Sequence, residues 1–314
     1  MNGNFPKIEI LAPFGAAFEW MKGMLFRPFD LARWLTLAFA AFIAGSWGNG
    51  INFQYRKSFG DVNYRVQRQG EVPDWTIPPW LIALIVAAIL VVLLLAVLWA
   101  WVTARGRFVF TDCIVRNRAA IGEPWREYRR EGNSFFLFSV LAGVASVLAL
   151  IVVGVIAWVP VRRIFFDSGD DSGGAKAVLI VLGVLLLFLW LAAIIFVNLI
   201  GHFMVPVMYR RRCSAGAAFL DVTKLVVRHA GPIVLFVLFR IALAIAVAVV
   251  GTMLACMTCC IGGLPYISTA LLLPAIVWLA AYRLLFLRQF GDGYDAWGGT
   301  AAPVAQLQEL PPNQ

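Results

Sequence analysis

Charged residues are scarce in this sequence of 314 residues, and histidine is almost absent. Asp, Glu, Lys and Arg make up 14% of the chain, against roughly 25% in an ordinary soluble domain. The two histidines, His202 and His229, are too few for a histidine-rich metal site and are poorly placed for a haem site. We therefore expect no metal ion and no cofactor.

Cysteine is scarce as well, and three of the five cysteines stand close together, at Cys256, Cys259 and Cys260. A zinc site needs four good ligands, and no histidine or further cysteine lies near these three. We expect them to be small, buried apolar residues. A disulfide between Cys256 and either Cys259 or Cys260 stays open as the alternative, because such bonds form in an oxidising compartment.

What the sequence does contain is hydrophobic residues, which make up 61% of it. They occur in uncharged runs, and about 20 residues at ~1.5 Å each cross a ~30 Å hydrocarbon layer. The longest run is divided by a turn at Gly262-Gly263-Leu264-Pro265. We therefore predict an all-α, polytopic membrane bundle of six transmembrane helices. The runs are bounded by Arg33 and Arg56, Asp74 and Arg105, Glu131 and Arg162, Lys176 and Arg210, and Arg240 and Arg283.

The formal charge of +9 follows the expected topology, so it does not indicate a nucleic-acid partner. Sixteen Lys and Arg fall in the connections on one side of the six spans and seven on the other. Because the cytoplasmic side carries the excess, both termini are predicted to be cytoplasmic. Most of the basic residues are Arg, which we attribute to a GC-rich bacterial genome, and the expected location is the bacterial inner membrane.

Three cytoplasmic segments look like short amphipathic helices lying on the membrane: Phe14–Arg27, Pro124–Gly132 and Ser214–His229. Within or just before each segment, a glycine is followed three residues later by an aromatic residue: Gly15 by Phe18, Gly122 by Trp125, and Gly216 by Phe219. Each segment also leads into an expected transmembrane hairpin. This pattern predicts three repeated units. The predicted organisation is one domain, 1–290, with units at about 11–104, 117–209 and 213–288, followed by a disordered or extended cytoplasmic tail at 291–314.

The polar residues within the spans are expected near the inner surface, not in the middle of the membrane. Counting ~1.5 Å per residue from the outer ends of the helices puts four of them about 30 Å or more along. An ion pump or proton-coupled transporter needs ionisable groups near the bilayer centre, so these classes are disfavoured. The four residues are Asn198, His202, Arg240 and Arg283.

Basic residues next to the spans are candidates for contact with anionic lipid headgroups, which attract Lys and Arg at the inner leaflet. They follow the second and fourth spans and continue into the third amphipathic segment. The candidates are Arg116, Arg118, Arg210, Arg211, Arg212, Lys224 and Arg228.

Three sequence stretches carry a family resemblance: Leu25–Asp30, Pro124–Gly132 and Val205–Arg210. With them, the chain resembles a group of uncharacterised bacterial six-pass membrane proteins. These are distantly similar to the membrane domain at the N-terminus of some glycerophosphodiester phosphodiesterases. The resemblance implies a membrane bundle but no activity, because the phosphodiesterase chemistry belongs to a soluble barrel that is not expected here.

These features favour a non-enzymatic integral membrane protein, because no nucleophile and base occur together on one side of the membrane. We expect an accessory or assembly subunit of a membrane complex, or an organiser of the inner leaflet. The alternative is a lipid or small-molecule transporter with an apolar path between the repeats. The expected partners are the lipid bilayer, anionic lipids and other membrane-complex subunits.

Overall fold

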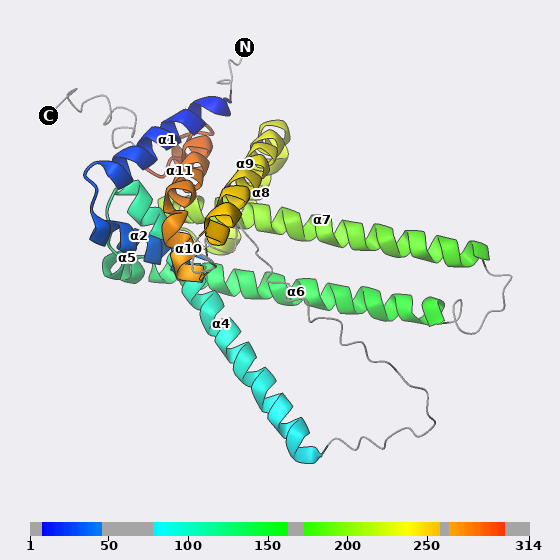
Figure 1. The fold of residues 1–314 in the computed structure, drawn as a ribbon. Coiled ribbons are helices and arrows are strands. Elements are labelled where there is room, and N and C mark those ends of the chain that lie inside the picture. The colour runs from blue at the N-terminus through cyan, green and yellow to red at the C-terminus, as the bar shows by residue number, and fades with distance from the viewer. Residues whose placement is uncertain (1–7, 46–77, 163–172, 258–263, 299–314) are drawn as a thin grey trace, which may run out of the picture.

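The computed structural model describes residues 8–45, 78–162, 173–257 and 264–298, and within these ranges it contains helices and no strand (Figure 1). The predicted all-α fold class is confirmed for this part of the chain. The helices are α1 (Leu11–Phe26), α2 (Leu31–Ile43), α4 (Pro79–Val115), α5 (Gly122–Glu127), α6 (Arg129–Arg162), α7 (Gly173–Arg211), α8 (Ala215–Arg228), α9 (Ala230–Met257), α10 (Pro265–Leu271), α11 (Leu273–Arg288) and the short 3-10 helix η4 (Asp292–Tyr294).

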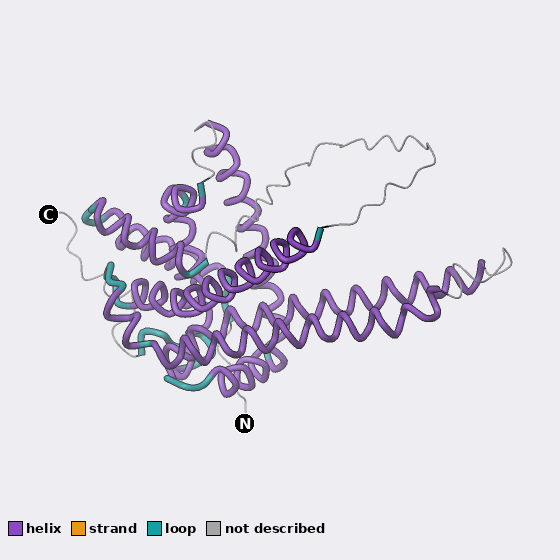
Figure 2. The backbone as a smooth tube through the Cα atoms, turned by 90° about the horizontal axis from the view of Figure 1, so that it is seen from below, coloured by secondary structure: helices purple, strands orange, loops and turns teal. Residues whose placement is uncertain are grey.

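Four helices in the described part of the chain, α4, α6, α7 and α9, are long and apolar enough to cross a membrane. The rest of the protein covers almost none of their most apolar stretches. α6 and α7 run side by side as a long hairpin in both views (Figures 1 and 2). Exposed to water, such surfaces would be strongly unfavourable, so these helices indicate a membrane protein. The four apolar stretches are Trp80–Val115, Arg129–Val155, Ile180–Arg211 and Ala230–Leu254.

The first and the last of the predicted spans fall on shorter helices. α2 has 13 residues and α11 has 16, which correspond to about 20 Å and 24 Å. The predicted continuation of the first span past Gly45 lies outside the described residues. In the last span, α10 and α11 are separate helices because Pro274, in the first turn of α11, has no backbone N–H to continue the preceding helix.

The helix that carries each Gly-to-aromatic motif packs against the neighbouring unit. α5 lies on α4, α8 lies on α7, and α1 lies along α11. The motif aromatics take part: Trp125 contacts Trp101, with ring centroids 5.9 Å apart, and Phe18 contacts Trp278 at 5.2 Å. Since α1 packs along α11, the first and the last α-helix of the described chain lie together.

The apolar faces of the motif helices cover protein. In α8 the predicted apolar residues Ala218, Val222 and Leu225 are buried in the common core. In α1 the buried face is formed by Ala17, Trp20 and neighbours, with Trp20 Nε1 donating to the carbonyl of Ile114 at 3.3 Å. A pattern of apolar residues on one face is the same for a membrane surface and a protein neighbour, so the sequence did not distinguish the two.

The helix predicted at Pro124–Gly132 differs in the structure. α5 ends at Glu127 and α6 begins at Arg129, so Gly132 lies inside α6 and does not end a helix. A Cβ at Gly132 would lie 2.8 Å from Cγ of Arg105. This glycine therefore allows α6 to approach α4 closely.

Candidate functional site

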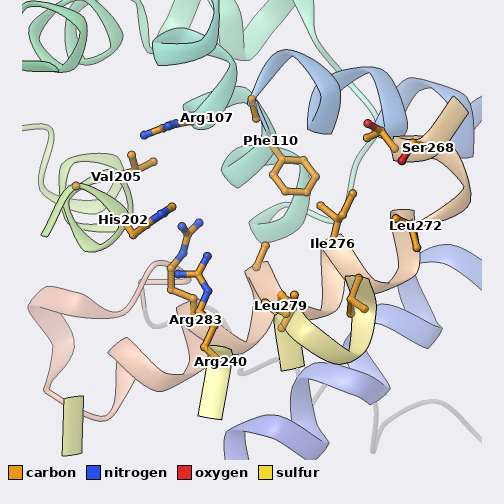
Figure 3. Close-up of a pocket in the computed structure, with 16 residues that line it drawn as sticks. Arg107, Phe110, His202, Val205, Arg240, Ser268, Leu272, Ile276, Leu279 and Arg283 are labelled. Atoms are coloured by element: carbon orange, nitrogen blue, oxygen red, sulfur yellow. The ribbon is translucent and has the colours of Figure 1, made fainter. Parts of the chain in front are cut away.

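A pocket of about 100 Å³ lies where all three units meet, between α4, α7, α9, α10 and α11 (Figure 3). One side is basic and is formed by Arg107, His202, Arg240 and Arg283. The opposite side is mostly apolar, and the residues that form it include Phe110, Leu272, Ile276 and Leu279, with Ser268 at its far end. The site is therefore amphipathic, with a cationic end and an apolar end.

Arg107 is held in place by a close crossing of α4 and α2. A Cβ at the preceding Gly106 would lie 2.7 Å from the backbone carbon of Ile43 and 2.8 Å from the backbone nitrogen of Ala44. Only glycine permits this approach. On its other side, the Arg107 guanidinium lies 5.5 Å from the ring centre of Phe135 on α6, a cation–π distance.

Buried aromatic neighbours orient the other three basic residues. Phe203, next to His202, packs against Phe236 at 5.8 Å. Tyr282, next to Arg283, packs against Phe236 at 5.0 Å and against Phe239 at 5.9 Å. Because these rings occupy the core side of α7, α9 and α11, the adjacent basic side chains turn into the pocket.

The charges in the pocket have no carboxylate to balance them. None of the described residues that line it is Asp or Glu. Arg240, Arg283 and Arg107 all act electrostatically on His202, and Figure 3 shows these side chains gathered together. Nε of Arg283 is buried and has no hydrogen-bond partner among the described residues. Charges that are partly removed from solvent are normally paired, so this arrangement is suited to binding an anion.

The comparisons with known proteins place the chain in a family. A model described as a family of unknown function, DUF7544, matches residues 9–296. The chain belongs to the DUF7544 family. The match includes every residue of the pocket, so the site lies wholly within the family's domain. No curated protein and no solved structure matched, and nothing found supports the resemblance to the membrane domain of glycerophosphodiester phosphodiesterases.

Three of the four polar residues predicted near the inner surface meet in this DUF7544 pocket: His202, Arg240 and Arg283. The fourth, Asn198, donates a hydrogen bond to the carbonyl of Ile194 on its own helix at 2.9 Å and is exposed. The structure holds no bilayer, so the depth of all four stays a prediction.

Sequence reasoning missed Arg107, because it was counted among the basic residues of a connection. A signal for it exists. Gly106-Arg107-Phe108 precedes the Gly122 motif in the same way that Gly201-His202-Phe203 precedes the Gly216 motif, by 15 residues from Arg107 and 14 from His202. Arg107 and His202 thus occupy matching positions ahead of two of the motifs, and each lines the pocket.

Most of the predicted lipid-contact residues are paired within the protein. Arg116 and Arg118 both bind the fully buried carboxylate of Asp112, at 3.0 and 2.9 Å. Tyr209 also donates its hydroxyl hydrogen to this carboxylate, at 3.0 Å. The two arginines are thus tied to the end of α4, which Tyr209 joins to α7, so only part of their charge is available to lipid.

Arg211 and Arg212 are paired too, whereas three other candidates are not. Arg211 binds Asp221 at 2.6 Å, and Arg212 binds Glu127. Among the described residues, Arg210, Lys224 and Arg228 form no ion pair, and all three are exposed. Of the seven candidates, these three keep their charge free of any ion pair with a described residue.

Glu127 joins two parts of this network, because it accepts hydrogen bonds from Arg212 and from Arg116. Partial burial alone would raise its pKa. The two guanidiniums outweigh burial and hold the pKa of Glu127 below its usual value. Glu127 is therefore ionised at neutral pH and ties α5 to the residues that follow α4 and α7.

Of the three clustered cysteines, the structure describes only Cys256. Cys256 is exposed near the end of α9, whereas Cys259 and Cys260 lie outside the described residues. The alternative disulfide stays a prediction. Within the described ranges, no three His, Cys, Asp or Glu side chains gather where they could hold a metal ion.

Proposed function

We propose that this protein is a non-enzymatic integral membrane protein that binds the anionic headgroup of a lipid in the basic pocket and so organises the inner leaflet. The observation that carries the proposal is the meeting of three arginines and a histidine with no carboxylate among the described residues that line the pocket. Bidentate guanidinium groups are well suited to phosphate and carboxylate oxygens. A lipid supplies both the anion and an apolar part for the opposite wall.

The proposal includes a six-span topology with both termini in the cytoplasm of a bacterial inner membrane. Its support is the excess of Lys and Arg on one side of the expected spans and the four helices of membrane-spanning length. In this topology α2 and α10–α11 complete the first and third hairpins. The basic ends of the helices and the motif helices then lie at the inner surface.

Labelling of single cysteines in intact cells tests the topology. A cysteine introduced at Glu9 or at Asp292 should be protected from a membrane-impermeant maleimide, since both positions would face the cytoplasm. A cysteine introduced at Ser172 should be labelled. Labelling at Glu9 but not at Asp292 would contradict the six-span arrangement.

Lipid binding is tested on the purified full chain in a mild detergent. Phosphatidylglycerol should raise the midpoint of thermal unfolding, whereas phosphatidylcholine should have little effect, because ligand binding to the native state stabilises it. The stabilisation should be lost in Arg240→Gln and kept in Arg126→Gln, which changes an exposed arginine outside the pocket. Equal stabilisation of both variants would contradict binding in this pocket.

Lipid transport is the second candidate function. It is favoured by the position of the pocket between all three units, with a basic side and an apolar side in one cavity. Purified protein in vesicles that carry a fluorescent anionic lipid distinguishes the two. Movement of the lipid between leaflets that stops in Arg240→Gln would indicate transport, and stable binding without movement would indicate the organising role.

The organising role extends to other membrane proteins as an accessory or assembly subunit. The apolar faces of α4, α6 and α7 that the protein itself leaves uncovered would bind either lipid or partner helices. Native purification in mild detergent, followed by mass spectrometry, tests this. Polypeptides recovered in fixed ratio would support the accessory role, and recovery of the protein with lipid alone would speak against it.

A further inference from the structure

The charge of the pocket indicates what kind of headgroup it receives. Arginine stays protonated in proteins, so Arg107, Arg240 and Arg283 together contribute three positive charges. No described acidic residue lines the same cavity. A ligand with a single negative charge would leave two half-buried cations unbalanced, which is unfavourable in a site with an apolar wall.

The shape of the pocket suits one end of a lipid. The basic residues gather at one side of a cavity of about 100 Å³, and apolar residues line the other side. A polar group held at the basic side can therefore extend its apolar chains along the apolar side.

The number of acceptor oxygens on the ligand also favours a phosphate monoester. A phosphate monoester carries a charge of about −1.5 to −2 at pH 7 and has three terminal oxygens. A phosphodiester or a fatty acid has one charge and two such oxygens. Three guanidinium groups, each a planar fork of donors, match the three oxygens of the monoester.

Resting on the lipid-binding function proposed above, we infer that the ligand is a phosphate monoester attached to an apolar chain, held at the junction of the three units. Its terminal phosphate binds Arg107, Arg240 and Arg283, and its first apolar carbons lie against Phe110 and Ile276. The binding arginines come from α4, α9 and α11, so the ligand bridges these three helices. No bond is made or broken in this binding.

The experiment compares lipids that differ in one methyl group. Dioleoyl phosphatidate has a terminal phosphate monoester, whereas dioleoyl phosphatidylmethanol is the corresponding methyl diester with a single charge and nearly the same size. Binding to the full chain in detergent is measured by native mass spectrometry and by the shift in thermal unfolding. We expect phosphatidate to bind at least about tenfold more tightly, a difference of ~1.4 kcal/mol.

Matched variants test whether the preference for phosphatidate depends on the arginines of the pocket. Arg240→Gln and Arg283→Gln should each reduce the preference for phosphatidate to less than about threefold, and Arg126→Gln should retain it. Thermal unfolding of each variant without lipid shows whether it is folded. A folded Arg240→Gln protein that keeps the full preference would overturn the inference.

Other outcomes separate this inference from the function on which it rests. If phosphatidate and phosphatidylmethanol bind equally, and both depend on Arg240, the headgroup inference is wrong and anionic lipid binding stands. If neither lipid binds in a way that depends on the pocket arginines, both are wrong. If inorganic phosphate binds as tightly as phosphatidate, the ligand is a free phosphate group and the apolar chain is excluded.

Discussion

Arg283 shows how a single residue can be unfavourable for stability and favourable for binding. Its Nε is buried without a described hydrogen-bond partner, and it lies near Arg240 and Arg107. Such a group lowers the stability of the native state unless a ligand compensates it. Functional sites often retain this kind of local cost.

We predict that Arg283→Gln unfolds at a higher temperature than the native protein when both are free of lipid. Removing a buried charge from its like-charged neighbours should stabilise the fold by about 1–3 kcal/mol. The measurement is thermal unfolding in a nonionic detergent after exhaustive removal of lipid. Arg288→Gln is the control and should not stabilise, because Arg288 is paired with Asp295 at 3.4 Å. A lower midpoint for Arg283→Gln would show that the site is already balanced.

Asp112 shows the reverse situation, a buried charge that is fully paired. We predict that Asp112→Asn destabilises the protein by about 1–3 kcal/mol, because it removes the buried carboxylate that Arg116, Arg118 and Tyr209 share. Asp221→Asn, which breaks a partly exposed pair with Arg211, should cost less than about 1 kcal/mol. Unfolding in denaturant measures both. Equal losses would mean that the Asp112 network contributes no more than a surface pair.

At the scale of the element, the crossing of α2 and α4 depends on one glycine. Gly106→Ala places a Cβ 2.7 Å from the Ile43 backbone, so the two helices have to separate. Overpacking of this kind costs about 1–3 kcal/mol, and moving α4 displaces Arg107. We predict lower thermal stability and weaker lipid binding. Gly143→Ala is the matched control, since its Cβ would meet nothing within 4 Å. The same loss in the control would refute a role for the crossing.

The basic residues of α8 face away from the protein. Lys224 and Arg228 are exposed and make no ion pair with a described residue, whereas the acidic Asp221 of the same helix binds Arg211 at the end of α7. We predict that the double variant Lys224→Glu, Arg228→Glu binds vesicles of phosphatidylglycerol at least about tenfold more weakly, at ~1 kcal/mol for each basic residue near the surface. Co-sedimentation of the detergent-purified protein with the vesicles measures this. Unchanged binding would place α8 away from the headgroups.

For the whole molecule, local sequence patterns predicted the long helices but not the contacts between helices. Uncharged runs of membrane-spanning length gave α4, α6, α7 and α9, because hydropathy is a property of the run itself. The break at Leu272 was missed, although Pro274 is visible in the sequence, because the length of an apolar run does not show where the helix is interrupted.

The pocket could be predicted only in part, for a related reason. His202, Arg240 and Arg283 were recognised as unusual because each interrupts an apolar helix. Arg107 stands among many basic residues and was not distinguished from them. That the four meet depends on contacts between residues up to 176 positions apart, from Arg107 to Arg283, and no local pattern encodes such contacts.

The packing of α1 along α11 brings the two ends of the described fold together. Glu9 and Gln289 exchange hydrogen bonds of 2.7 and 2.8 Å across 280 positions of the chain. The arrangement of the helices therefore depends on their packing and not on where the chain begins. We predict that a circular permutant that links the native ends through a short flexible segment, and begins instead at the junction before Gly122, still inserts, folds and binds lipid. Loss of the folded state on size-exclusion chromatography would show that the chain must be made in its native order.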